Sequence, residues 1–200
     1  MASACSTTIP LQSNLNNQTL LEAHNKNIKA DFVLNSNVTN GKIKEIYIKK
    51  NGKRSGSKEF DYKSTTAFKK MWSSYFDNKF NKFAKDEMKI NVTLKNLYLK
   101  QHFTTSTGHA ILTGMLGAAD SKSHVDAVGD INVVVKYKGK TYKKEFNPST
   151  SDYQETQSTN YGTFSKKNSM EQRSILLEKT LNKSIVQFDN FVRQILASDK

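Results

Sequence analysis

The stretch FKKMWSSYFDNKFNKFA, residues 68–84, decides how this chain folds. Its large apolar side chains recur at steps of three and four residues, which places them on one stripe of an α-helix. Burying seven side chains of this size stabilises a fold by roughly 10–20 kcal/mol, at about 1.5–3 kcal/mol each, provided that a broad apolar surface receives them. We therefore expect this helix to pack on a β-sheet. The stripe consists of Phe68, Met71, Trp72, Tyr75, Phe76, Phe80 and Phe83.

The opposite face of the same helix is polar and rich in lysine. Aromatic residues interleaved with lysines can also bind single-stranded nucleic acid by stacking. The helical spacing of the aromatic residues favours burial in the core instead, because it gathers them on one side. Ser64 or Thr65 is expected to cap the first turn.

Two predicted strands precede the helix. Apolar residues alternate over residues 28–34, and a second apolar run covers residues 43–48. The second run leads into Asn51-Gly52, the strongest short signal for a β-hairpin. The returning arm, residues 53–62, has a weak strand pattern.

One long strand is predicted directly after the helix. Apolar residues alternate from Met88 to Leu94 and then continue on the opposite parity at Leu97 and Leu99. Since a change of parity would turn apolar side chains to the other face, we expect a β-bulge near Lys95-Asn96. The length of this strand indicates a central position in the sheet.

The last third of the sequence predicts a hairpin, a loop and a second helix. Residues 128–146 read as two strands with a turn at 138–140, and the polar residues 149–168 read as a long loop. Ser169-Met170-Glu171-Gln172 fits a capping box that opens a helix ending near Ala197. The apolar stripe of this helix consists of Leu177, Leu181, Ile185, Phe188, Val192 and Ile195.

This order of elements predicts an α+β fold, with a largely antiparallel sheet and two long amphipathic helices packed on one of its faces. Residues 28–200 are expected to form a single domain. Residues 1–27 are polar and rich in asparagine, so we interpret them as a tether.

The charge of the chain is +13 at pH 7, which predicts attraction to anionic partners. Residues 41–70 carry ten basic residues against three acidic ones. Only three of the basic residues in the chain are arginine, and base-reading sites favour arginine, so a specific nucleic-acid reader is disfavoured. The hairpin tip is the candidate patch for an anionic partner, although edge lysines also serve to keep strands of different molecules apart. The patch consists of Lys49, Lys50, Lys53 and Arg54.

Residues 103–127 combine apolar side chains with glycines and show no clear period. Such a segment is either a loop with an exposed apolar tip, able to contact a membrane or a protein, or a short buried helix. The candidate contact residues are Ile111, Leu112, Met115 and Leu116.

Catalytic motifs are not evident, so we expect no enzyme activity and no cofactor. Three histidines lie in or beside the segment 103–127 with aspartates nearby, but no spacing such as HxH or HExxH occurs, and no metal site is predicted. These residues are His102, His109, His124, Asp120, Asp126 and Asp130.

Cys5 is the only cysteine and follows the small residues Ser3-Ala4. This start, the long helix followed by MKINVTLKNLYL, the hairpin DINVVVKYKGKTYKKEF and the terminal helix through LNKSIVQFDNFVRQIL together resemble small outer-membrane lipoproteins of Gram-negative bacteria. The similarity is to the YajG-type family and, more distantly, to the lipopolysaccharide-transport lipoprotein LptE. The resemblance implies a lipid anchor on Cys5 and a location at the outer membrane, facing the periplasm.

The expected function is therefore that of a non-catalytic envelope lipoprotein, a binding or assembly factor that contacts lipopolysaccharide, other anionic envelope components or another envelope protein. The alternative is a soluble basic module that binds nucleic acid non-specifically, with an affinity that falls steeply as salt rises.

Overall fold

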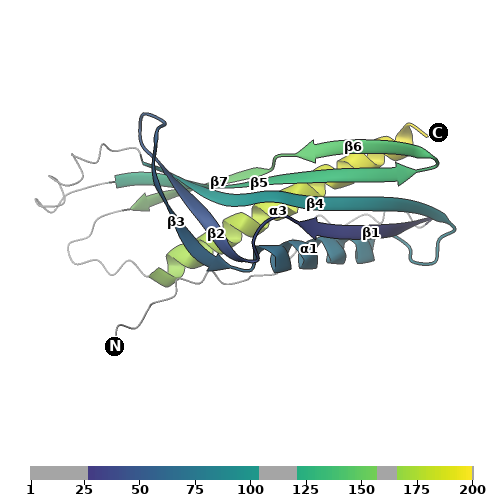
Figure 1. Cartoon of the computed structure of the whole chain (residues 1–200), viewed down its shortest axis with the longest axis horizontal. Coiled ribbons are helices and arrows are strands. Elements are labelled where there is room, and N and C mark those ends of the chain that lie inside the picture. The colour runs from purple at the N-terminus through teal and green to yellow at the C-terminus, as the bar shows by residue number, and fades with distance from the viewer. Residues whose placement is uncertain (1–26, 104–120, 157–165, 200) are drawn as a thin grey trace, which may run out of the picture.

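The structure, a computed structural model, describes residues 27–103, 121–156 and 166–199. These residues form seven strands in one sheet and two helices (Figure 1). The strands are β1 (Ile28–Ser36), β2 (Gly41–Ile48), β3 (Arg54–Tyr62), β4 (Asp86–Phe103), β5 (Ser121–Tyr137), β6 (Lys140–Phe146) and β7 (Ser149–Thr156), and the helices are α1 (Ser64–Lys79) and α3 (Lys166–Ala197).

The centre of the sheet is the antiparallel pair β4 and β5, which stay paired from Lys89 opposite Lys136 to Phe103 opposite Ser123. Shorter strands flank each half of this pair. β1 and β6 lie beside one half, and β2 and β7 lie beside the other, with β3 outside β2. The pairs of β4 with β1 and with β2 are parallel, whereas the other four pairs are antiparallel. The sheet is therefore largely antiparallel, as predicted.

The β-bulge predicted in the long strand is confirmed, because the register of β4 against β5 shifts between Leu94 and Asn96. Met88 and Leu94 before the bulge and Leu97 and Leu99 after it are all buried. The extra residue lets the strand change parity while its apolar side chains stay on the core face.

Both helices pack on one face of the sheet, as the amphipathic stripes predict (Figure 1). Trp72 of α1 is fully buried, and its ring lies 5.2 Å from the ring of Phe188 in α3. Tyr75 donates a hydrogen bond of 2.7 Å to Asp189 in the same core. Burial and this carboxylate raise the pKa of the Tyr75 phenol well above its usual range, so the phenol remains a donor at physiological pH.

Two predictions about the ends of α1 are wrong. The helix ends at Lys79, and Phe83 lies beyond it with 94% of its surface exposed. A separate turn holds this segment. The backbone N–H of Asn81 donates a hydrogen bond to the carbonyl of Ile28, and the side-chain oxygen of Asn81 accepts one from the backbone N–H of Phe83. At the other end the N-cap residue is Lys63, and the Ser64 hydroxyl donates to the carbonyl of Thr39 instead of capping the helix.

The segment 103–127, expected to be a loop or a short buried helix, and the predicted loop at 149–168 both overlap strands of the sheet. β4 includes Phe103, β5 begins at Ser121, and residues 149–156 form β7. α3 begins at Lys166, so the proposed capping box at residue 169 lies inside the helix. The sequence did not predict β7, because its residues are almost all polar, whereas strands are recognised by alternating apolar residues.

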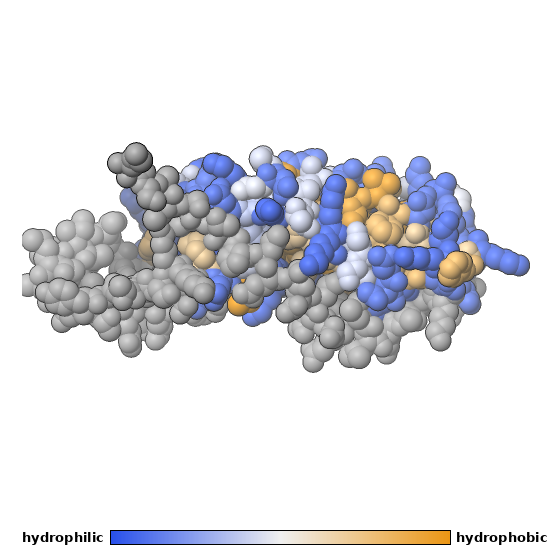
Figure 2. Space-filling view, turned by 90° about the horizontal axis from the view of Figure 1, so that it is seen from below, coloured by the Kyte–Doolittle hydropathy of each residue, from blue (hydrophilic) through white to orange (hydrophobic). Residues whose placement is uncertain are grey.

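The described surface seen from below Figure 1 is mostly hydrophilic, with one group of hydrophobic residues right of centre and smaller hydrophobic spots elsewhere (Figure 2). Within the described part of the chain, none of the helices has the length and hydropathy needed to span a bilayer. The large hydrophobic residues that remain exposed there are Val33, Phe83, Ile175 and Val186.

Candidate functional site

An open hollow with a volume of about 470 Å³ lies where the β2–β3 hairpin tip meets the ends of β4 and β5. Its walls come from three parts of the sequence that are far apart. The lining residues are Ile48, Lys49, Lys50 and Gly52 from the hairpin, Lys100, His102 and Phe103 from β4, and His124 from β5.

Strand pairing and turn geometry position the hairpin lysines. β2 runs parallel to β4 and places Ile48 opposite His102. A tight turn follows. The backbone N–H of Lys49 donates a hydrogen bond of 2.9 Å to the carbonyl of Lys53, and the backbone N–H of Gly52 donates one of 2.8 Å to the carbonyl of Lys49. Gly52 has a φ of +76°, which glycine adopts without steric cost. The turn therefore keeps Lys49 and Lys50 at the rim of the hollow.

The lining carries three lysines and no carboxylate. In the described residues, no carboxylate forms an ion pair with Lys49, Lys50 or Lys100. Lys49 and Lys50 are exposed, and the Lys100 ammonium lies 5.5 Å from the centre of the Tyr98 ring. Like charges gathered around a concave surface focus their field there, and three lysines give this surface a local excess of positive charge.

The structure divides the patch predicted at the hairpin tip. Lys49 and Lys50 line the hollow, whereas Lys53 and Arg54 are exposed outside it. Arg54 instead donates a hydrogen bond of 3.1 Å to Ser57 within its own hairpin.

The sequence interpretation missed Lys100 as part of the site. Lys100 and His102 occupy alternate positions of β4 that face away from the core, so the sequence alone indicates only weakly that they share a surface. Only the parallel pairing of β2 with β4 brings them beside the hairpin tip.

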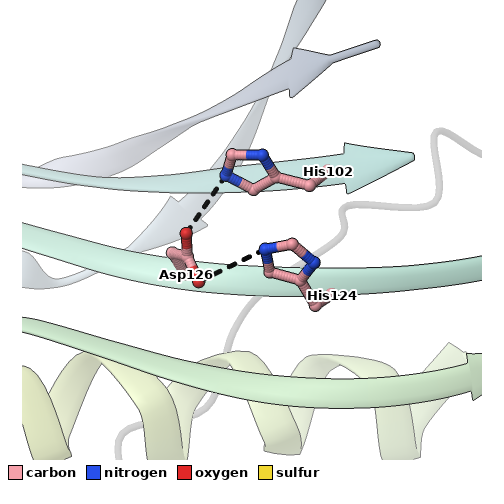
Figure 3. Close-up of side chains that lie close together, drawn as sticks. All are labelled: His102, His124 and Asp126. Carbon is pink, nitrogen blue, oxygen red and sulfur yellow. Dashed lines mark ion pairs between the residues drawn. The ribbon is translucent and has the colours of Figure 1, made fainter. Parts of the chain in front are cut away.

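Three titratable side chains, His102 of β4 and His124 and Asp126 of β5, lie close together (Figure 3). The two histidines line the hollow. The distance from His102 Nε2 to Asp126 Oδ2 is 3.1 Å, and that from His124 Nε2 to Asp126 Oδ1 is 3.9 Å. The two imidazole rings are stacked, with their centres 4.4 Å apart and their planes 3° from parallel. This grouping was not predicted, because it joins two strands rather than following a spacing along the chain.

The remaining candidate residues are Asp130 and a set that lies outside the described residues. Asp130 accepts a hydrogen bond of 2.9 Å from Asn96 instead of joining the histidines. The residues Cys5, His109, Asp120, Ile111, Leu112, Met115 and Leu116 lie outside the described residues.

Comparison with known proteins does not place the chain in a family. Neither a protein-family model nor a curated protein matches it. A solved structure, described as that of an uncharacterized protein, is similar over 89% of this chain and 95% of its own, with 10% sequence identity and a TM-score of 0.34. Likeness at this level carries no inference about function.

Proposed function

We propose that this protein is a non-catalytic envelope binding protein whose hollow receives phosphate groups of anionic lipid or lipopolysaccharide. The observation that carries the proposal is the concave surface with Lys49, Lys50 and Lys100 around it and no carboxylate in its lining. Its volume of about 470 Å³ lies within the range of about 300–1,000 Å³ that is usual for small-molecule sites.

Lysine suits this ligand class. Its ammonium group binds phosphate as a point charge on a flexible stem and does not require the single bidentate geometry of arginine. The half-buried histidines His102 and His124 add ring nitrogens to the same wall. A phosphate group that varies in position between lipid molecules can therefore still be held.

The binding test compares two double variants with the same change in charge. Lys49→Glu with Lys50→Glu alters the lining, whereas Lys53→Glu with Arg54→Glu alters the same hairpin tip outside it. The first is expected to weaken binding to phosphatidylglycerol vesicles by about 30-fold or more, because two ammonium groups that face the bound phosphate are lost, at about 1 kcal/mol each, and reversal adds repulsion. The second is expected to weaken binding only a few-fold. Vesicle sedimentation measures both.

Phosphatidylcholine vesicles and lipopolysaccharide complete the comparison. Neutral vesicles are expected not to bind, and lipopolysaccharide is expected to follow the same order of variants. Equal losses in the two double variants would show that diffuse charge, and not the hollow, determines binding. Binding of duplex DNA that exceeds vesicle binding at equal salt would favour the nucleic-acid alternative.

The envelope location is the second part of the proposal and rests on Cys5 with the polar stretch that follows it. A lipid on this cysteine would hold the domain near the anionic head groups that the hollow is proposed to bind. Intact mass spectrometry of the native, full-length protein from its host is expected to show a lipid mass on Cys5. An unmodified chain would refute the lipid anchor, while the vesicle experiment would still test the hollow.

A further inference from the structure

We propose that His102, His124 and Asp126 bind a divalent transition-metal ion, with Zn²⁺ as the reference ion. The sequence predicts no metal site, since the ligands do not follow a familiar spacing. The fold supplies the arrangement instead, and two of the three ligands, His102 and His124, also line the hollow proposed above to bind anions.

Strand register brings the three side chains to one face of the sheet. His102 of β4 and His124 of β5 are directly opposite each other across the antiparallel pair. Such cross-strand partners have Cβ atoms about 4.5–5.5 Å apart. Asp126 follows His124 by two residues in the same strand, so its side chain points to the same face. Two central strands, which are held over their whole length, therefore position all three ligands.

The separations suit one ion. One nitrogen or oxygen from each residue lies within 4.8 Å of the other two. Two ligand atoms that bind Zn²⁺ at about 2.0–2.1 Å in tetrahedral geometry are about 3.3–3.5 Å apart. The distance from His102 Nε2 to Asp126 Oδ2, 3.1 Å, is slightly below this range, and the distance from His124 Nε2 to the other carboxylate oxygen, Oδ1, is 3.9 Å.

Two polar atoms of the cluster lack hydrogen-bond partners among the described residues. His102 Nε2 and Asp126 Oδ1 are both buried, and neither forms a hydrogen bond with the described residues. Buried polar atoms of this kind call for an explanation, and a coordinated ion is one that satisfies both at once. The side chains of His102 and Asp126 are 30% and 19% exposed, although these two atoms themselves are buried.

One rotation completes the geometry. Both Nε2 atoms point toward the Asp126 carboxylate, but the rings are parallel, so their lone pairs do not converge on one point (Figure 3). Turning at least one imidazole about its Cβ–Cγ bond directs both lone pairs to a shared ion. This torsion has a broad energy well in histidine.

The donor set selects the class of ion. Imidazole nitrogen with one carboxylate suits zinc, copper, nickel or ferrous iron, whereas Ca²⁺ and Mg²⁺ prefer all-oxygen ligands. Three protein ligands leave at least one coordination position open, as in sites where a water or an anion completes the shell.

The test is calorimetric titration of Zn²⁺ into the full chain, freed of metal and carrying Cys5→Ser to remove its thiol. We expect one saturable Zn²⁺ site. Each of the variants His102→Ala, His124→Ala and Asp126→Asn is expected to lower the affinity for Zn²⁺ by about 100-fold. This is the upper end of the loss that follows when a residue that only supports a metal ligand is replaced. Asp130→Asn is the matched control, because Asp130 lies on the same face of β5 and pairs with Asn96. It should bind Zn²⁺ like the parent chain.

Co²⁺ provides a spectroscopic check on the ligands. Visible d–d absorption should appear on adding one equivalent of Co²⁺ and should change in each ligand variant but not in Asp130→Asn. Absence of saturable binding, or equal affinity in the parent and the Asp126→Asn variant, would overturn the metal site. Vesicle binding measured in EDTA tests the lysine hollow separately, so failure of one proposal is distinguishable from failure of the other.

Discussion

Trp72→Ala is expected to lower the free energy of unfolding by about 3–5 kcal/mol, the usual cost of truncating a large aromatic side chain in a core. Trp72 is fully buried and contacts the rings of Phe68, Phe76 and Phe188. Phe188 belongs to α3, so the resulting cavity would lie at the junction between the two helices. Urea denaturation followed by circular dichroism measures the change.

Phe83→Ala is the matched control, because Phe83 continues the same sequence stripe but is 94% exposed. Its replacement is expected to change the stability by about 0.5 kcal/mol or less. A loss below about 1 kcal/mol for Trp72→Ala would contradict its burial, given the range expected for core truncations.

Arg173→Met is expected to cost about 3–5 kcal/mol, because it leaves a buried carboxylate without its partner. Arg173 in α3 donates to Glu45 Oε1 in β2 through two nitrogens, at 3.2 and 2.7 Å. The side chains are only 8% and 1% exposed, and the guanidinium also lies 5.4 Å from the centre of the Phe60 ring. This pair connects the last helix to the strand that carries the hairpin lysines.

The double variant Glu45→Leu with Arg173→Met separates burial of an unpaired charge from loss of packing. Replacing both members of a buried ion pair by apolar residues is often neutral or stabilising. We therefore expect the double variant to be more stable than Arg173→Met alone in urea denaturation. If the loss of stability in the double variant equals the sum of the losses in the Glu45→Leu and Arg173→Met single variants, the contribution of Arg173 comes from packing and not from the ion pair.

The periodic parts of the sequence predicted the fold class well. Three features depend on residues that are close together in the sequence, and each can be recognised from the order of those residues. They are the stripe of α1, the change of parity at Lys95-Asn96 and the hairpin turns. The turn at Lys138-Gly139 has positive φ at both residues, as the tight two-residue hairpin requires. Prediction failed where the pattern was polar, as in β7, or where a helix ended without a strong stop signal, as before Phe83.

By itself, the sequence determined the two amphipathic helices, the long central strand with its bulge, and the excess of positive charge near the hairpin tip, since these depend on neighbours along the chain. The tertiary structure alone decided which charges share a surface. Parallel pairing of β2 with β4 joins Lys49 and Lys50 to Lys100, and antiparallel pairing of β4 with β5 sets His102 against His124. Register between distant strands follows from burying the apolar face of the whole sheet against the helices, so no local pattern of the polar residues could specify these contacts.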